Sequence, residues 1–86
     1  MTCRIDRVLI EQGVVLHISG RIAGEDLDVL RTALEEGRVV ALDLTEVKLA
    51  ERDAVTFLAR IERNGIELRH CPAYIREWVT RERGRS

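Results

Sequence analysis

The hydrophobic and polar positions of the chain alternate between strand-like and helix-like periods. Residues 38–44 are apolar on both alternating sides and include β-branched residues, which is typical of a strand covered on both faces at the centre of a sheet. Residues 45–50 are more polar, and we expect a loop there. From Glu51 onward apolar residues recur at steps of three and four, with Phe57 beside them, and predict one buried helix face: Ala54, Val55, Leu58 and Ile61.

The ends of this predicted helix carry the charges that a helix dipole favours. Glu51 and Asp53 lie in its first turn, and Arg60 and Arg63 lie in its last turn. Asn64-Gly65 then supplies the left-handed residue that commonly ends a helix. The second half of the chain is therefore predicted to run from strand to loop to helix.

The N-terminal half predicts a hairpin followed by a helix. Residues 5–11 and 14–19 are strand candidates separated by Gln12-Gly13, a tight-turn signal, so we expect an antiparallel pair. Residues 20–24 are expected to form a loop. After an acidic first turn, and before Gly37 closes the helix, one apolar face is formed by Leu27, Leu30, Ala33 and Leu34.

The C-terminal part predicts an edge strand and a third helix. Residues 66–71 alternate strictly, which favours a strand with one wetted face, and Pro72 fits the first position of a helix. Residues 80–86 are expected to fray. The apolar face of this helix, expected in the core, is Tyr74, Ile75, Trp78 and Val79. The resulting order, ββαβαβα, predicts an α/β fold in a single small domain spanning residues 1–86.

Composition and charge narrow the function classes. The chain has 86 residues, 45% hydrophobic, with one Phe, one Tyr and one Trp, so the core should be aliphatic. A formal charge of −1 gives no attraction to nucleic acid or anionic membranes. No apolar run is long enough to cross a bilayer and residues 1–6 do not begin a signal peptide, so we expect a cytoplasmic protein. Cys3 and Cys71 have no metal-site spacing and are expected to be reduced.

Four segments together resemble a known family. Residues 19–22, 40–47, 64–68 and 71–73 are similar in order and spacing to a STAS domain, the family of bacterial anti-sigma factor antagonists and of cytoplasmic domains of sulphate transporters. The resemblance implies a mixed four-stranded sheet with helices mainly on one face. It also implies a non-enzymatic regulatory module without a cofactor, whose partner is a protein such as an anti-sigma factor or a kinase-like regulator.

The resemblance fails at one motif. Antagonists of this family carry Asp-Ser-Ser/Thr-Gly at the start of the second helix, where a kinase-type anti-sigma factor phosphorylates a hydroxyl. That motif aligns with residues 51–54, and Arg52 and Asp53 occupy the hydroxyl positions. The usual phospho-acceptor is therefore absent, and Thr45 and Thr56 are the nearby hydroxyls left as alternatives.

Three classes of function follow. The favoured hypothesis is a protein-binding surface around the second helix start, made of Arg21, Leu49, Glu51, Arg52, Asp53 and Thr56. An acidic first turn is equally ordinary in a solvated helix, so that plainer interpretation stays open. The alternative is a small-ligand or nucleotide sensor in which residues 20–24 and the helix start present N–H groups, although Glu51 and Asp53 oppose an anion there. An enzyme is least favoured, because His17, His70 and Asp43 have no positioned nucleophile.

The family arrangement of strands also predicts an association surface. If the helices cover one face of the sheet, the other face is expected to carry Val15, His17, Val39, Ala41 and Arg69. Monomers seldom expose large apolar patches, so we expect the N-terminal hairpin to cover this face, or a second copy to cover it in a homodimer.

Overall fold

The computed structural model describes residues 3–84, which form one mixed sheet and three helices. In chain order the elements are β1 (Cys3–Ile10), β2 (Gly13–Ile22), a 3₁₀ turn η1 (Gly24–Asp26), α1 (Leu27–Glu36), β3 (Val39–Ala50), α2 (Arg52–Arg63), β4 (Glu67–Arg69) and α3 (Ala73–Arg83). The strands follow the order β1-β2-β3-β4, with β1 antiparallel to β2 and the other pairs parallel. The predicted ββαβαβα order, the hairpin and the edge position of the last strand are confirmed.

The hairpin passes very close to the start of β3. Gly13 has φ of 150°, and a Cβ there would run into the Arg38 carbonyl oxygen. The next residue, Val14, donates its N–H to that same oxygen at 2.8 Å. Glycine is required because β2 must approach the β3 backbone closely at this point.

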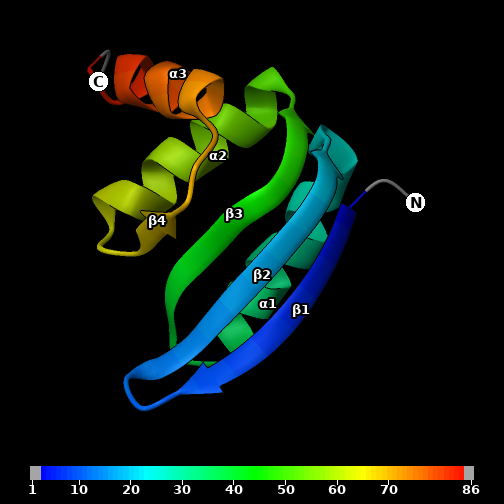
Figure 1. Cartoon of the computed structure of the whole chain (residues 1–86), viewed down its shortest axis with the longest axis vertical. Helices are drawn as coiled ribbons and strands as arrows, with labels where there is room; N and C mark the ends of the chain where they lie inside the picture. Colours follow the sequence, from blue (N-terminus) through cyan, green and yellow to red (C-terminus); the bar gives the residue numbers. More distant parts are fainter. Residues whose placement is uncertain (1–2, 85–86) are drawn as a thin grey trace.

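The aliphatic core lies between the sheet and the helices. Leu16 and Ile18 of β2 and Leu42 of β3 are fully buried in one cluster with residues of all three helices. Figure 1 shows α1 behind the β1–β2 hairpin, whose near face carries no helix. The predicted buried faces of α1 and α2 are confirmed. Leu30 of α1 is fully buried. Ala54, Val55 and Leu58 of α2 are also fully buried, and Phe57 and Ile61 are nearly so.

The opposite face of the sheet carries a polar row. Asp6, His17, Asp43 and Arg69 are cross-strand neighbours through all four strands. The hairpin belongs to the sheet and does not cover this face, so that part of the prediction is wrong.

Val39 is also misplaced by the prediction, which put it on the open face. The register between β2 and β3 shifts between Val14 and Val15, so Val39 pairs with Val14 and packs against the core. A bulge of this kind moves a side chain from one face to the other, because successive strand residues alternate in direction.

β3 continues through the segment that was predicted to be a loop. Residues 45–50 are strand because they pair with β2, where Val47 lies opposite Gly20 and Ala50 opposite Ile22. The loop predicted at residues 20–24 is likewise wrong up to Ile22, which ends β2. Register shifts interrupt the alternation of buried residues there, and this hid the strand from a pattern-based prediction.

α3 also differs from its prediction at both ends. Tyr74 is 48% exposed rather than in the core, and its hydroxyl donates to the Lys48 carbonyl oxygen. Ile75 and Val79 are fully buried, as predicted, whereas Trp78 is only partly buried where it packs against the core. The helix continues to Arg83 and so includes residues 80–83, where the sequence led us to expect fraying. Residues 85–86 lie outside the described part of the chain.

Candidate functional site

The start of α2 is fastened to the end of β2 by Glu51. Its N–H donates to the Ile22 carbonyl oxygen at 2.9 Å. Its carboxylate accepts the Gly24 N–H at 3.1 Å and the Arg21 guanidinium at 2.5 Å. Because these donors stabilise the anion, Gly24 first and then Arg21, the pKa of Glu51 is held below its ordinary value. One side chain therefore fixes the geometry of two elements far apart in the sequence.

This contact bears on the ligand-sensor hypothesis. That hypothesis needs N–H groups around residues 20–24 that are available to an anion. The Gly24 N–H is instead bound by the protein's own carboxylate, and Asp53 lies so near that a Cβ on Gly24 would be 3.3 Å from its Oδ2. An anionic ligand would have to displace one carboxylate and approach another, so the geometry disfavours it.

The residues predicted to bind a partner lie together. Leu49, at the end of β3, pairs with Arg21 of β2 and is 46% exposed. Arg52 and Asp53 are exposed in the first turn of α2, and Thr56 is exposed one turn further on. We call the six residues Arg21, Leu49, Glu51, Arg52, Asp53 and Thr56 the α2-start surface. Within residues 3–84, neither Arg52 nor Asp53 takes part in an ion pair.

A shallow hollow borders this surface between α1 and α2. It has a volume of about 220 Å³ and is lined by Leu27, Arg31, Asp53, Thr56, Phe57 and Arg60. The Arg31 guanidinium lies 5.8 Å from the centre of the Phe57 ring, a cation–π distance, and also pairs with Asp28 at 2.9 Å. Arg31 and Arg60 were not predicted as site residues, because only the packing of α1 on α2 brings them beside Thr56.

Thr45 lies elsewhere, against Asp43. The Asp43 carboxylate accepts the Thr45 hydroxyl at 2.6 Å and its N–H at 3.0 Å. Burial opposes ionisation of this carboxyl, but the Thr45 hydrogen bonds and the nearby His17 and His70 outweigh it, so the pKa of Asp43 is lowered. The two candidate acceptor hydroxyls are thus in different electrostatic surroundings.

The two cysteines are not activated thiols. Cys3 and Cys71 are free, and burial raises the pKa of both thiols. A thiol with a raised pKa is protonated at neutral pH and is a poor nucleophile. Neither Cys3 nor Cys71 therefore has the lowered pKa that a nucleophilic thiol needs.

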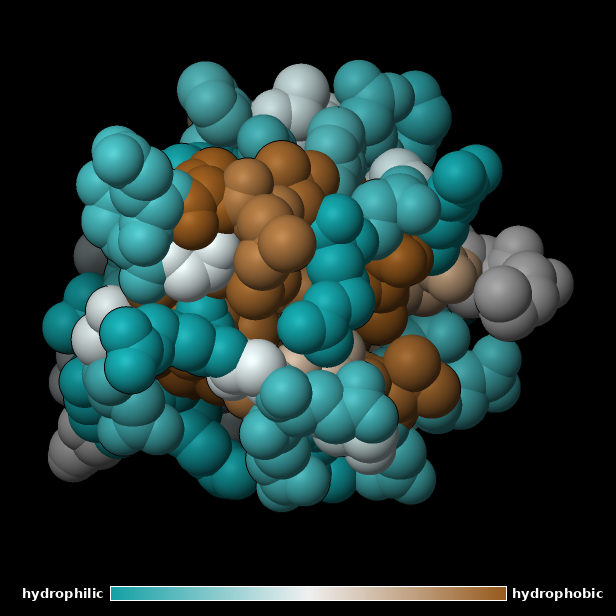
Figure 2. All heavy atoms as spheres, turned by 90° about the horizontal axis from the view of Figure 1, so that it is seen from below, coloured by the Kyte–Doolittle hydropathy of each residue, from teal (hydrophilic) through white to brown (hydrophobic). Residues whose placement is uncertain are grey.

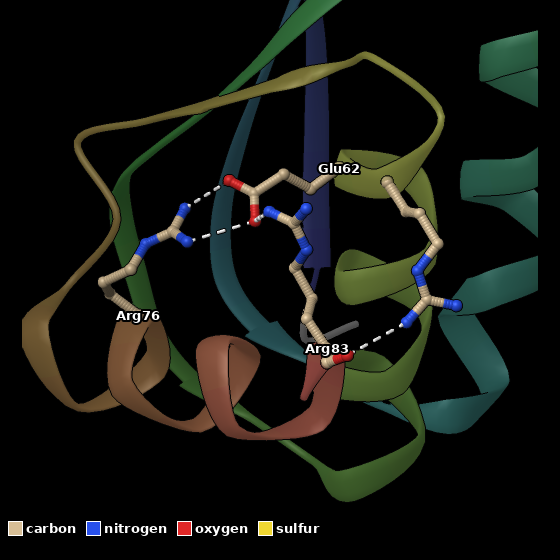
Figure 3. Close-up of polar contacts among 4 residues, drawn as sticks. Glu62, Arg76 and Arg83 are labelled. Carbon is tan, nitrogen blue, oxygen red and sulfur yellow. Dashed lines mark hydrogen bonds and ion pairs between the residues drawn. The ribbon is translucent and has the colours of Figure 1, made fainter. Parts of the chain in front are cut away.

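The other end of α2 carries a second acidic anchor. The Glu62 carboxylate accepts two hydrogen bonds from Arg76 of α3, at 3.1 and 2.7 Å, and one from Arg83 at 3.0 Å (Figure 3). Chiefly because of the Arg76 hydrogen bonds, the pKa of Glu62 is lowered, and that of Arg76 is raised. Bidentate guanidinium–carboxylate pairs are geometrically specific, so this contact fixes how α3 packs on α2.

Metal-binding and membrane-spanning features are absent from the described residues. Between Cys3 and Gly84 no group of three or more His, Cys, Asp or Glu side chains is arranged to hold a metal ion. No helix in the same range has the length and apolar character needed to cross a membrane. No protein-family model matches the chain, and no curated protein matches it.

Proposed function

We propose that this protein is a non-enzymatic regulatory module resembling an anti-sigma factor antagonist, and that the α2-start surface binds a protein partner. One observation supports this above the others. The Glu51 carboxylate is bound within the protein, by Arg21 and the Gly24 N–H. Arg52 and Asp53 remain exposed and, among the described residues, form no ion pair. Arginine is enriched at protein interfaces, and this surface combines the exposed Arg52 with Leu49, which is 46% exposed.

The charge pattern of this surface is fixed rather than switched. Asp53 stands where the family resemblance places a phosphorylatable hydroxyl, and it carries one negative charge against the roughly two of a phosphate. Arg52 adds a cation beside it. We infer that the partner is selected by the fixed sequence of charges at Glu51, Arg52 and Asp53, without a kinase cycle at this position.

The two remaining hydroxyls differ as phosphate acceptors. A phosphate on Thr45 would be placed against the Asp43 carboxylate, which its hydroxyl now contacts, and like charges repel. A phosphate on Thr56 would lie in the hollow lined by two arginines, Arg31 and Arg60, against one carboxylate, Asp53. If a displaced phospho-switch exists, Thr56 is the position that the electrostatics favour.

An affinity pull-down from an extract of the native cells tests the proposed surface. The bait is the unmodified chain, the Arg52→Ser variant or a matched control, Arg38→Ser, which removes the same charge at an exposed position before β3. We expect the unmodified chain and the control to capture the same partner. Arg52→Ser should bind it about tenfold more weakly, the loss typical of an interface residue worth slightly more than 1 kcal/mol.

Two results would contradict the proposal. Equal capture by Arg52→Ser and by the unmodified chain would remove the α2-start surface as the binding site. A rise in melting temperature with nucleotides or small anions, where we expect none, would favour the ligand sensor instead, since a ligand at 100 times its Kd stabilises by about 2.7 kcal/mol.

A further inference from the structure

The two edges of the sheet are unequal. β4 has three residues, whereas β1 has eight and, among residues 3–84, its outer side has no neighbour in the sheet. Long unpaired edge strands are places where another chain can add a strand. β1 is therefore the edge at which a partner strand has room to pair.

The hydrogen-bond alternation of the hairpin shows which backbone groups of β1 face outward. Val14 donates its N–H to Arg38 on the β3 side, so its cross-strand pair with Leu9 is not hydrogen-bonded. In an antiparallel pair such positions alternate with hydrogen-bonded ones. By this alternation Cys3, Ile5 and Arg7 present N–H and C=O groups to the free edge.

An apolar groove runs beside this edge. It has a volume of about 410 Å³ between β1 and α1, and it is lined by Ile5, Arg7, Asp28, Val29, Thr32, Ala33 and Glu36. Val29 is 61% exposed and Leu9, further along β1, is 82% exposed. Seen from the hairpin end, Figure 2 shows apolar side chains gathered together and framed by hydrophilic ones. An open edge and exposed apolar side chains thus lie on the same side of the molecule.

We propose that a second copy of this chain pairs with β1, antiparallel and related by a two-fold axis through Ile5. At that position each Ile5 presents its outward N–H and C=O to the other, so the two residues can exchange hydrogen bonds. Arg4 of each copy then lies opposite Asp6 of the other copy, on the open face of the sheet. On the helix face the two Ile5 side chains meet and the two grooves join.

Charge complementarity selects this register. An axis through Asp6 would place two carboxylates opposite each other, and an axis through Arg7 would oppose two guanidiniums, and directly opposed like charges destabilise a sheet. An axis through Val8 avoids repulsion but forms no ion pair. Only the Ile5 axis, among these four, places two opposite-charge pairs across the strands, and such pairs stabilise a sheet.

This interface is separate from the proposed partner-binding site. It uses Arg4, Ile5, Asp6, Val29 and Ala33, and none of these belongs to the α2-start surface. A symmetric dimer would carry two such surfaces. The inference therefore stands or fails independently of the proposed function.

Charge reversal and mixing test the register. Arg4 and Asp6 are exposed, with side chains 78% and 50% accessible, so reversing either charge should leave the fold intact, as far-ultraviolet circular dichroism can verify. We expect sedimentation to give a dimer for the unmodified chain and monomers for Arg4→Asp and for Asp6→Arg. An equimolar mixture of the two variants should recover a dimer, seen by native mass spectrometry as the mixed species.

The mixture is the decisive arm of this experiment. Arg4 and Asp6 also pair within one chain at 3.2 Å, and each variant breaks that pair, so recovery on mixing can come only from contacts between copies. Val8→Glu is the matched control and should remain dimeric, since Val8 lies outside the ion pairs. A monomeric unmodified chain at high concentration would overturn the proposal. A dimer insensitive to both reversals, or one broken by Val8→Glu, would overturn the Ile5 register.

Discussion

Each end of α2 has a glutamate that binds arginine, but the two glutamates differ in how far they are buried. Glu62 at the C-terminal end is 17% exposed and accepts three hydrogen bonds from Arg76 and Arg83, so that α3 is held in place. Glu51 at the N-terminal end is 39% exposed and binds Arg21 and the Gly24 backbone. Arg76 and Arg83 therefore hold α3 against α2, whereas Arg52 stays exposed beside the fixed Glu51. The difference in burial distinguishes an anchor within the fold from a surface available to a partner.

The largest expected effect comes from truncating a core side chain of α2 that lies between its two ends. Leu58 is fully buried in the middle of α2, so Leu58→Ala should lower the free energy of unfolding by about 2–5 kcal/mol. In a domain of this size that is a large part of the total stability. Denaturant titration measures it, and a loss below about 1 kcal/mol would mean that the α2 register is wrong.

A smaller effect is expected from changing only Glu62, which anchors α3 to the C-terminal end of α2. Glu62→Gln removes the charge that Arg76 and Arg83 share and should cost about 1.5–3 kcal/mol, the range for hydrogen bonds to charged groups. The matched control is Glu77→Gln, which breaks the exposed pair with Arg81 and should cost at most about 1 kcal/mol. Equal losses in the two variants, measured by urea unfolding, would remove the distinction drawn from burial.

Acidic pH should weaken the same anchor. The pKa of Glu62 is lower in the folded protein than in the unfolded chain, so the folded state gains stability above the unfolded pKa, about 4.3. That gain is lost as the pH falls through the folded pKa. The stability difference between the unmodified chain and Glu62→Gln should thus be full at pH 7 and shrink below about pH 4. A difference that grows on acidification would contradict the assigned direction of the shift.

The smallest effect on stability is expected at the α2-start surface. Arg52 is exposed and has no ion pair within residues 3–84, so Arg52→Ser should change the free energy of unfolding by no more than about 0.5 kcal/mol. Its effect should instead be on partner capture. If urea unfolding shows a loss as large as that of Glu62→Gln, Arg52 has a structural role and the contrast between the two ends disappears.

Local periodicity was enough to predict most of the fold. The buried face of α2 and the antiparallel hairpin are visible in the spacing of apolar residues and in one turn signal. Residues 45–50 could not be recognised as strand, because their hydrogen bonds come from residues of β2 that are distant in the sequence. Tyr74 follows a helical apolar pattern, yet its hydroxyl reaches a backbone carbonyl at the surface, which periodicity does not encode.

The candidate site was predicted in its sequence-local part only. Glu51, Arg52, Asp53 and Thr56 are recognisable as one helix start, and the structure brings Arg21 and Leu49 to them through strand pairing. The bond from the Gly24 N–H to Glu51 was not foreseen. It depends on how the connection between β2 and α1 packs against the start of α2. Neither the composition of the chain nor the spacing of its residues indicates that contact.

The central claim is that the surface at the start of α2 acts through fixed charges, and the intact mass of the protein purified from its native cells tests it most directly. With Arg52 and Asp53 in place of the hydroxyls, we predict a single population at the unmodified mass. Fragmentation would locate any added group. A substantial population heavier by one phosphate, mapped to Thr45 or Thr56, would contradict the fixed-charge account and establish a phospho-switch at a displaced position.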